Sequence, residues 1–410
     1  QGFAVTMFDA QPSPDAFGSG IGLAAGPWDH LLLTGVDLVV ASPGFSERSA
    51  PVVDTLEAGI RIWSEIEFAS QYIDVPMIAV TGTNGKTTVT EVTSQMLEAS
   101  GIDAPPAGNI GAPLSDFVGR NHDALVVETS SFQLRFIDEF HPVAAAITNV
   151  AVDHLDWHGS AGAYAAAKRN IYRNQDETDL LVFDADDDGA AELARHSPGA
   201  RFPVSGTILP EGGGGRDGDR LVVGDIHVSI GDLPNGDPTH LVNLAFGAAL
   251  SSWLGADPEA IAQAALSFRP GKHRREVVAE IDGVVWVDDS KATNPHAAIA
   301  SIRSRDSVVL IAGGLAKGID VSPIAREPNL SAVIGIGEAG PGLAEAAGAV
   351  GQSAETLEMA IQIAARVARP GDTVLLAPGC ASFDQFESYV ARGDRFQELV
   401  NQLIVEVNAK

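Results

Sequence analysis

The segment that most constrains the fold is an apolar run that breaks into a glycine-rich loop and then opens a helix. Residues 77–80 predict a short buried strand, and Gly82-Thr-Asn-Gly-Lys-Thr-Thr88 follows it, with a helix expected to run toward Leu97. Glycines let the backbone wrap closely around an anion, with successive N–H groups pointing inward. The helix N-terminus adds positive dipole. The segment therefore predicts a phosphate-binding loop between a strand and a helix.

Two side chains of this loop suit nucleotide chemistry. Lys86 is placed to reach the terminal phosphates, and Thr87 can offer its hydroxyl to Mg²⁺. The loop departs from the usual GxxxxGK[ST] pattern, because Val80 stands where the first glycine would be. An ordinary glycine-rich turn between a strand and a helix is the alternative, and the Lys-Thr-Thr run in register favours phosphate binding.

Composition limits the classes of protein that fit. A chain of 410 residues predicts two or three domains. Its net charge of −28 argues against general binding of nucleic acid or anionic membranes, although one local loop and a metal can still bind a nucleotide. A lone cysteine, Cys380, excludes an internal disulfide framework, no apolar run reaches membrane-spanning length, and no signal peptide is visible. A cytoplasmic location is the simplest expectation.

The chain divides into three predicted α/β blocks, residues 1–73, 74–270 and 271–410. Residues 268–273, with Pro and Gly, are the expected linker before the last block. Alternation of strands with helical stretches predicts mainly parallel, helix-covered sheets, and so an α/β fold. The predicted strands are 38–41, 124–128, 144–148, 284–287, 307–311, 332–336 and 373–376.

Three other segments carry structural expectations. Residues 1–9 are typical of the second strand of an α/β unit, and a first strand with a glycine-rich turn would normally precede them. The Gly/Asp-rich stretch 211–219 predicts an exposed loop before a small β element. Gly335-Ile-Gly-Glu-Ala-Gly340 fits the dinucleotide fingerprint GxGxxG. Nothing else in the chain demands a redox cofactor, so tight packing between a strand and a helix is the favoured interpretation of that motif.

Polar residues gather where predicted strands end. Glu128 follows a strand and is a candidate Mg²⁺ ligand, with a helix-capping acid as the alternative. Asp153, His154, Asp156 and His158 follow another strand within six positions, and spacing alone does not choose among them. A zinc site is not convincing there, because there is no cysteine partner and no HExxH motif.

Further polar loops complete the pattern. Lys168 lies in an Ala-rich helical stretch, where spacing alone favours a solvated lysine. His273-Arg274-Arg275 forms a cationic cluster after the expected linker and could clamp phosphates. Loops at 287–295, 313–318 and 380–386 each follow a predicted strand, at the edge where open α/β sheets bind ligands. These loops predict a substrate cleft shared by the second and third blocks.

Taken in order, the motifs resemble those of the Mur ligase family. They are 82–88, 108–111, 128–134, 149–156, 289–294 and, most discriminating, Pro378-Gly-Cys-Ala-Ser-Phe-Asp-Gln-Phe386, which resembles the branch that adds D-glutamate. The resemblance covers nearly the whole chain. It implies three α/β domains: a Rossmann-like N-terminal domain that binds the uridine nucleotide, a P-loop ATPase central domain, and a Rossmann-like C-terminal domain that receives the amino acid.

The resemblance also implies a reaction. An ATP-dependent, ADP-forming ligase would join D-glutamate to UDP-N-acetylmuramoyl-L-alanine through an acyl phosphate, in peptidoglycan precursor synthesis and hence cell-wall biogenesis, cell shape and cell division. Implied cofactors are two Mg²⁺ ions and a CO₂-derived carbamate on Lys168, which turns that lysine into an anion. A cytoplasmic monomer is expected, with no nucleic-acid partner and no membrane span.

Roles are implied residue by residue. Catalysis falls to Lys86, His154 and Lys168, and metal binding to Thr87, Glu128, His154 and carbamylated Lys168. ATP contacts fall to Gly82, Thr83, Asn84, Gly85, Lys86, Thr87, Thr88, Asn243, Arg274, Asp289 and Lys291. Contacts to the muramoyl nucleotide fall to Ser42, Pro43, Gly44, Asn109, Ser130 and Gln133, and those to D-glutamate to Thr293, Lys317, Ser382, Phe383 and Tyr389.

The sequence departs from the family pattern at four places. The first strand and its uridine loop are missing before Gln1, and a usual Thr-Arg pair is Ala10-Gln11. A usual His-Asn pair appears as Thr239-His240, and an aromatic position of the glutamate site is Tyr389, which adds a hydroxyl. The uridine and adenine contacts are therefore the least secure of the implied roles.

Two alternative functions stay open. A folylpolyglutamate synthase-like ligase shares the ATPase core, and folate-dependent phosphate release would reveal it. A non-catalytic nucleotide-binding or regulatory module would bind ATP without turnover. The Cys380–Gln385 motif speaks against the first alternative, and the retention of Lys86, Glu128, His154 and Lys168 against the second.

Overall fold

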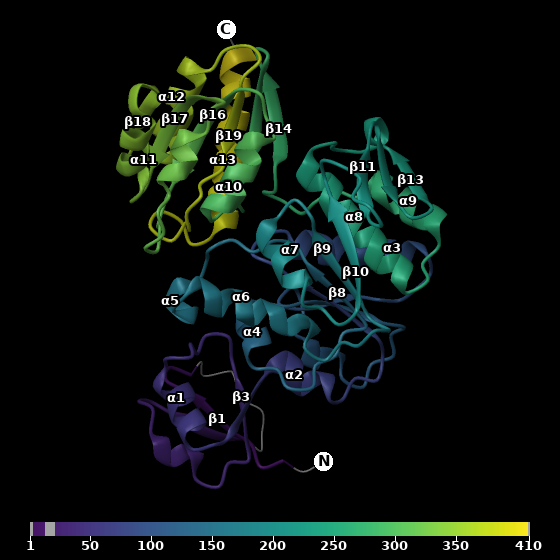
Figure 1. Cartoon of the computed structure of the whole chain (residues 1–410). Helices are drawn as coiled ribbons and strands as arrows, with labels where there is room; N and C mark the ends of the chain where they lie inside the picture. Colours follow the sequence, from purple (N-terminus) through teal and green to yellow (C-terminus); the bar gives the residue numbers. More distant parts are fainter. Residues whose placement is uncertain (1–2, 13–20, 409–410) are drawn as a thin grey trace. The chain divides into compact units, whose positions relative to one another are not determined.

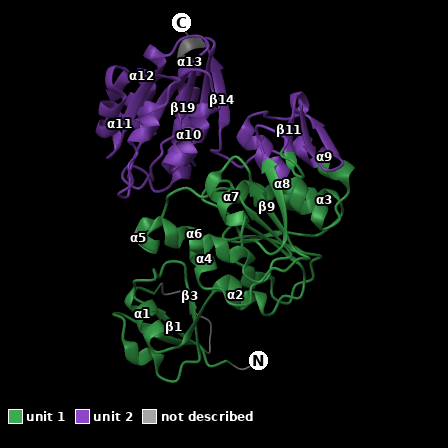
Figure 2. Cartoon of the chain, viewed as in Figure 1, with its two compact units in different colours: residues 1–204, 210–214, 246–261 green, residues 205–209, 215–245, 262–410 purple. Residues whose placement is uncertain are grey.

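The computed structural model describes residues 3–12 and 21–408. Contacts divide the chain into two compact units (Figure 2). Unit 1 comprises residues 1–204, 210–214 and 246–261, and unit 2 comprises residues 205–209, 215–245 and 262–410. The first predicted block thus shares a unit with the phosphate-loop segment, and the three-domain boundaries at 73 and 270 stay a prediction.

The N-terminal part of unit 1 contains two short parallel strand pairs. β1 (Thr6–Asp9) pairs with β2 (Gly22–Ala25), and β3 (Leu38–Ala41) pairs with β4 (Arg61–Ser64). Helices α1 (Ala50–Glu57) and α2 (Glu65–Ser70) flank β4 in sequence, and the 3₁₀ turn His30–Leu33 precedes β3. The strand expected over residues 1–9 is therefore present as β1, while Gln1 and Gly2 lie outside the described residues.

Six parallel strands of a nine-stranded sheet follow in the chain (Figure 1). Their order is β10-β9-β8-β5-β7-β6, and each neighbouring pair is parallel, while three further strands continue the sheet beyond β10. The strands are β5 (Met77–Thr81), β6 (Pro106–Gly108), β7 (Leu125–Glu128), β8 (Ala144–Ile147), β9 (Leu180–Asp184) and β10 (Ala200–Ser205). The helices are α3 (Lys86–Ala99), α4 (Ser131–Arg135), α5 (Leu155–His158), α6 (Ala161–Arg169) and α7 (Asp188–Ala194). A central position in the parallel part of the sheet explains the apolar run Met77–Val80 of β5, a strand that is buried along its whole length.

A buried carboxylate ties the N-terminal part of unit 1 to this sheet. Glu67 of α2 has no exposed surface, and its two oxygens accept the backbone N–H groups of Asp138, Glu139 and Phe140 at 2.8–2.9 Å. Gln71 also donates to the same carboxylate at 3.1 Å. Charge-assisted bonds to backbone N–H groups are among the stronger hydrogen bonds in proteins, so this contact fixes α2 against the loop before β8.

Glu67→Gln is expected to destabilise the fold by about 2–4 kcal/mol, because an amide of either orientation turns an N–H₂ group toward a buried backbone N–H. Chemical denaturation measures the change. Glu57→Gln, at an exposed position of α1, is the matched control and should stay within about 0.5 kcal/mol of the unmodified chain. Equal stability of the two variants would contradict the assignment.

A second carboxylate, at the end of β9, makes stability depend on pH. Burial raises the pKa of Asp184 to about 7, with the nearby charges of Asp186 and Asp187 adding to the effect and the N–H of Asp186 opposing it. An unfolded aspartate titrates near 4, so between these values the folded chain binds more protons than the unfolded one. Stability should therefore fall as pH rises from about 4 to about 7.

Asp184→Asn should remove this fall. At pH 8 the variant should be more stable than the unmodified chain by about 1–3 kcal/mol, and below pH 4 the difference should vanish. Denaturant titrations at pH 4, 6 and 8 give the answer. A constant difference across that range would show that Asp184 titrates normally.

The segment between β10 and the last block holds β11 (Gly214–Asp217), β12 (Arg220–Val223), β13 (Ile226–Ser229), α8 (Pro238–Trp253) and α9 (Pro258–Ser267). β12 and β13 form an antiparallel hairpin. The predicted exposed loop over 211–219 is wrong in part, because Gly214 and Gly215 are buried at the start of β11. A Cβ on Gly213 would lie 2.0 Å from the Pro203 carbonyl oxygen, so a glycine here allows close backbone approach to β10.

Unit 2 is built on a six-stranded sheet of order β14-β15-β19-β16-β17-β18, in which β14 alone of these strands is antiparallel to its neighbour. The strands are β14 (Glu276–Ile281), β15 (Val284–Asp288), β16 (Val308–Gly313), β17 (Leu330–Ile336), β18 (Gly351–Ser353) and β19 (Thr373–Leu376). The helices are α10 (Pro295–Arg303), α11 (Gly340–Ala347), α12 (Leu357–Val367) and α13 (Tyr389–Asn408).

Strand periodicity divides the core of unit 2 between the two faces of the sheet. Val309 and Ile311 of β16 pack in one cluster with residues of α12 and α13, whereas Val308 and Leu310 pack in another with residues of α10 and α11. Helices therefore cover both faces (Figure 1), and the prediction of an α/β fold with mainly parallel sheets is confirmed.

The GxGxxG segment connects β17 to α11 in this sheet. A Cβ on Gly335 would lie 2.1 Å from the Gly340 carbonyl oxygen, so the glycines permit close packing of the strand on the helix. The packing interpretation of this motif is thereby confirmed. Among the helices of the described residues, none is both long and apolar enough to cross a membrane.

Candidate functional site

The phosphate-binding loop has the backbone geometry that the sequence predicts. Gly85, in the left-handed conformation at φ 82°, caps the start of the 14-residue helix α3. A Cβ on Gly82 would lie 1.8 Å from Thr148 Oγ1, so only glycine fits against β8 there. The Lys86 ammonium donates to the carbonyls of Gly82 and Thr83, both at 3.0 Å. The loop thus joins a helix N-terminus to a cation, which is a favourable site for phosphate.

The segment after β8 is fastened to this loop. Asn149 accepts the backbone N–H of Asn84 at 2.8 Å and donates to the Asn84 carbonyl at 3.1 Å. Thr83 Oγ1 lies 3.0 Å from the Ala151 backbone nitrogen, which donates to it. The predicted phosphate loop and the predicted acidic and histidine-rich segment at 149–158 are therefore brought together.

Lys168 lies at the same place. It is 1% exposed, and its Nζ donates to the Gly82 carbonyl at 2.6 Å and lies 4.5 Å from the centre of the Tyr164 ring. Burial lowers its pKa well below the usual range, the positive charge of Lys86 lowers it further, and Asp153 opposes both. The alternative of a solvated lysine is wrong, because α6 turns this side chain inward to the phosphate loop.

Glu128 ends β7 beside this loop, and it is 2% exposed. Its Oε1 accepts the Asn109 side-chain amide at 2.7 Å, whereas Oε2 is buried and has no hydrogen-bond partner among the described residues. Gly108, at φ 90°, brings Asn109 to this position, since a Cβ there would meet the Glu128 carbonyl oxygen at 2.5 Å. The alternative that Glu128 caps a helix is wrong, because the residue that caps α4 is Ser130.

His154 stands at the start of α5 in the left-handed conformation, at φ 50°. Its ring is exposed and lies edge-on to Phe132, with centroids 4.8 Å apart. His158 points elsewhere, because its buried ring bonds Ser131 Oγ at 2.9 Å. The Asp153 carboxylate accepts the backbone N–H of His154 at 2.8 Å. The structure thus separates the candidates of this segment, although the side chain of Asp156 lies outside the described part.

The predicted nucleotide path runs along the same unit. Ser42 opens a turn in which its carbonyl accepts the N–H of Phe45 at 3.0 Å. The Pro43 carbonyl accepts the indole N–H of Trp157 at 3.2 Å. Ser130 and Gln133 form a reciprocal capping box at the start of α4. These two side chains have a structural partner already, and their substrate contacts stay a prediction.

In unit 2 three of the predicted ATP-contacting residues, Arg274, Asp289 and Lys291, lie in the segments before β14 and after β15, where the Lys291 N–H donates to the His273 carbonyl at 3.1 Å. Asp289 accepts the backbone N–H of Arg275 at 3.2 Å, and the Arg275 guanidinium lies 3.9 Å from its other oxygen. Burial raises the pKa of Asp289 to about 6, against the opposing charge of Arg275. Arg275 also bonds Asp237 at 3.0 Å. Arg275, one position after the predicted Arg274, is thus the arginine that engages this carboxylate.

Two cation–ring pairs bring together residues predicted for the ATP and D-glutamate contacts. Lys291 Nζ lies 4.0 Å from the centre of the Tyr389 ring, and Lys317 Nζ lies 5.4 Å from that of Phe383. Phe383 is 64% exposed, unusual for an aromatic side chain. Of the other predicted residues, Ser382 and Asn243 are buried and Thr293 is half-buried.

One buried arginine connects two predicted site loops and was not singled out from the sequence. Arg392 of α13 is 1% exposed. It donates to the hydroxyl and carbonyl of Ser290, both at 3.0 Å, and to the Cys380 carbonyl at 3.2 Å. The 289–294 and 380–386 loops are therefore held together. No sequence signal distinguished this residue, since arginines are common on helices.

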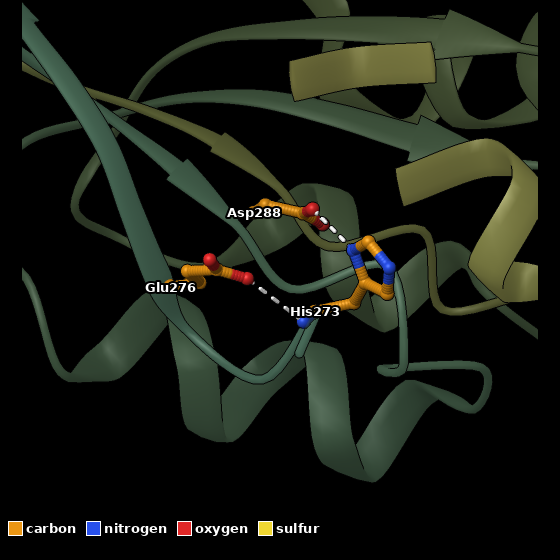
Figure 3. A group of neighbouring side chains, drawn as sticks. All are labelled: His273, Glu276 and Asp288. Atoms are coloured by element: carbon orange, nitrogen blue, oxygen red, sulfur yellow. Dashed lines mark hydrogen bonds and ion pairs between the residues drawn. The ribbon is translucent and has the colours of Figure 1, made fainter. Parts of the chain in front are cut away.

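A cluster of His273, Glu276 and Asp288 has the composition of a metal site but the bonding of a hydrogen-bond network (Figure 3). His273 Nδ1 lies 2.7 Å from Asp288 Oδ2, and its backbone N–H donates to Glu276. Gln397 donates to both carboxylates, at 2.9 and 3.0 Å. His273 and Gln397 thus bond the facing oxygens of Glu276 and Asp288. The cluster therefore fixes the start of β14 against β15.

Comparison with known proteins decides the family. Residues 80–207 match the Mur ligase middle domain, and residues 273–380 match the Mur ligase, glutamate ligase domain. A protein of Frankia casuarinae named UDP-N-acetylmuramoylalanine--D-glutamate ligase is 43% identical over 395 residues, covering 92% of this chain and 82% of that protein. The chain belongs to the Mur ligase family. A Salinibacter ruber protein of the same name is 38% identical, covering 90% of this chain and 85% of its own.

Solved structures agree on the Mur ligase fold. MurF from Acinetobacter baumannii matches with a TM-score of 0.62 at 19% identity, covering 88% of this chain and 90% of its own. A bifunctional folylpolyglutamate synthase/dihydrofolate synthase matches with a TM-score of 0.57 at 17% identity, covering 83% of this chain and 97% of its own. At such identities the likeness concerns the fold alone.

The residues present suit the Mg²⁺ that the family implies. Glu128 Oε2 is a buried carboxylate oxygen without a hydrogen-bond partner in the described residues, and an unpaired buried charge is costly unless a cation neutralises it. Carboxylate and hydroxyl oxygens are the ligands that Mg²⁺ prefers, and Glu128 and Thr87 supply both kinds. Lys168 as an ammonium ion could not serve as a ligand, whereas a carbamate on the same nitrogen could.

Proposed function

We propose that this Mur ligase family member joins D-glutamate to UDP-N-acetylmuramoyl-L-alanine, with cleavage of ATP to ADP and phosphate, in the cytoplasm. The observation that carries the proposal is that Lys86 and Lys168 both donate to the Gly82 carbonyl of the phosphate loop, while Glu128 lies opposite Val80 on the neighbouring strand, two positions before that loop. Relatives at 38% and 43% identity over most of their length carry the name of this activity.

The reaction begins when the carboxylate of the nucleotide substrate attacks the γ-phosphorus of ATP. A P–O bond to this carboxylate forms, the bond to the ADP oxygen breaks, and an acyl phosphate results. Negative charge spreads over the equatorial oxygens of the transferring group, so fixed cations and N–H donors lower the barrier. Lys86 and the N-terminus of α3 serve this purpose. Bound Mg²⁺ would neutralise phosphate charge, held by Thr87 and Glu128, with His154 and modified Lys168 at a second ion.

Lys168 requires chemistry of its own. Its lowered pKa makes the neutral amine accessible, and only the neutral amine is nucleophilic. Addition to CO₂ forms an N–C bond and releases a proton, leaving an anionic carbamate. The buried lysine thereby changes from a neighbour that repels cations into a ligand for one.

Unit 2 is proposed to bind the amino acid. The amine of D-glutamate attacks the acyl carbon, an amide bond forms, and phosphate leaves. Lys317 suits a glutamate carboxylate, beside the exposed ring of Phe383. Ser382, Thr293 and Tyr389 complete the proposed pocket. Asn243, Arg274, Asp289 and Lys291 are proposed to contact ATP.

Phosphate release in the presence of UDP-N-acetylmuramoyl-L-alanine and ATP tests the function, with D-glutamate, L-glutamate, L-alanine and a diamino acid offered separately. Release with D-glutamate alone supports the proposal. Release with another amino acid would keep the ligase and change its acceptor. Release only when a folate replaces the nucleotide would favour a folylpolyglutamate synthase-like reaction, and ATP binding without any turnover would favour a regulatory module.

A further inference from the structure

Trp157 lies between the Ser42–Gly44 turn and the loop that carries His154. Its indole N–H donates to the Pro43 carbonyl at 3.2 Å, across 114 positions of sequence, and the residue is 7% exposed. A buried indole N–H needs an acceptor, because an unpaired polar group in the interior costs free energy. This bond therefore holds the turn at a defined place.

The ring of Trp157 also reaches toward the reacting groups. The centroid of its ring lies 4.8 Å from that of Phe132. The Phe132 ring in turn meets the His154 ring edge-on, with centroids 4.8 Å apart. Val52 and Phe136 pack with Trp157 in a small buried cluster. One aromatic chain thus runs from the Pro43 turn to the proposed metal-binding histidine, entirely inside unit 1.

Residues 47 and 48, which follow the turn, contact α4 and the residue after α5. Glu47 forms an ion pair with Arg135 at the end of α4. Arg48 lies against Gly159, where a Cβ would come within 2.2 Å of its guanidinium. These contacts fix residues 47 and 48, which follow the turn in sequence, whereas the indole N–H of Trp157 bonds to the turn itself.

We propose that Trp157 is a positioning residue that sets the affinity for the muramoyl nucleotide by holding the Ser42–Gly44 turn in its binding conformation. The inference rests on the proposed function, which assigns this turn to the nucleotide path. A loop already ordered in the free protein loses less conformational entropy on binding, which favours affinity. Among the described residues, the hydrogen bond and ring contacts of Trp157 are to Pro43, Phe132, Phe136 and His158, and none is to the phosphate loop or Lys168. Its main effect is therefore expected on binding of the nucleotide substrate.

Trp157→Phe tests the proposal, because phenylalanine keeps a ring against Phe132 and removes the N–H. The KM for UDP-N-acetylmuramoyl-L-alanine should rise about tenfold, as loss of one hydrogen bond predicts, with kcat and the KM for ATP within about twofold. Trp286→Phe, the same change at a buried core position of unit 2, is the matched control and should leave all three constants unchanged. An unchanged nucleotide KM, a fall in kcat alone, or equal losses for both substrates would each overturn the proposal.

Hydrogen exchange of the free protein separates this inference from the proposed function. Trp157→Phe should speed amide exchange in a peptide covering residues 42–49, and Trp286→Phe should not. If the unmodified protein fails to turn over the nucleotide, the proposed function fails while the exchange experiment still shows whether Trp157 orders the turn. Unchanged exchange in Trp157→Phe would refute the positioning role whatever the substrate is.

Discussion

Lys168→Ala should lower the rate of ligation by at least about a thousandfold, the scale on which removal of a positioned charge acts in phosphoryl transfer. The fold should persist, because the Gly82 carbonyl keeps its bond from Lys86 at 3.0 Å when the bond from Lys168 is lost. Truncation also opens space beside the loop. Formate or acetate should enter it, supply the missing carboxylate-like oxygens and restore part of the rate. Steady-state kinetics with and without these anions, together with a melting curve, measure the prediction.

Two variants make this experiment decisive. Lys168→Arg keeps a positive charge and fills the space, but a guanidinium does not form the carbamate, so it should be inactive and not rescued. Arg169→Ala, at the adjacent exposed position, should retain normal activity. An active Lys168→Ala or Lys168→Arg enzyme would show that the lysine does not serve as a carbamate.

Glu128→Gln should lower kcat without lowering the melting temperature. The change neutralises a buried carboxylate whose Oε2 has no hydrogen-bond partner in the described part of the chain, while a carbonyl oxygen can still accept the Asn109 amide at the Oε1 position. Because Oε2 has no hydrogen bond to lose among the described residues, the melting temperature in metal-free buffer should stay unchanged or rise. Loss of a proposed Mg²⁺ ligand should lower kcat at least about a hundredfold.

Glu139→Gln offers a control, since that side chain is exposed and has no proposed part in the reaction. It should change neither the melting temperature nor kcat appreciably. Added Mg²⁺ gives a second readout, because it should raise the melting temperature of the unmodified protein and not that of Glu128→Gln. A Glu128→Gln enzyme with normal kcat and a normal response to Mg²⁺ would place the metal elsewhere.

The phosphate loop is predictable from neighbouring residues in the sequence. The side chains that pack against it from distant segments are not. The strand, glycine loop and helix at 77–97 depend on neighbouring residues, and the structure reproduces them as β5 and α3. Lys168 reaches Gly82 across 86 positions, and nothing in an Ala-rich helix says which face turns inward. Its place in the site was predicted by resemblance, while spacing alone pointed to solvent.

Similar reasons explain what was missed. Arg275 resembles its neighbour Arg274 in sequence, and only the pairing of β14 with β15 shows which one meets Asp289. Trp157 is one aromatic residue among many until its bond to Pro43 is seen. The glycines at 212–215 predict an exposed loop, yet Gly213 lies where two backbones approach closely, and a run of glycines does not by itself distinguish the two cases.

The central claim, that this site ligates D-glutamate, is tested most directly by the mass of its product. The protein would receive UDP-N-acetylmuramoyl-L-alanine, ATP, Mg²⁺ and equal amounts of unlabelled D-glutamate and ¹³C-labelled L-glutamate. We predict one nucleotide product, heavier than the substrate by one unlabelled glutamyl residue and formed together with an equal amount of ADP. A labelled product, or ADP formation with the nucleotide mass unchanged, would contradict the account.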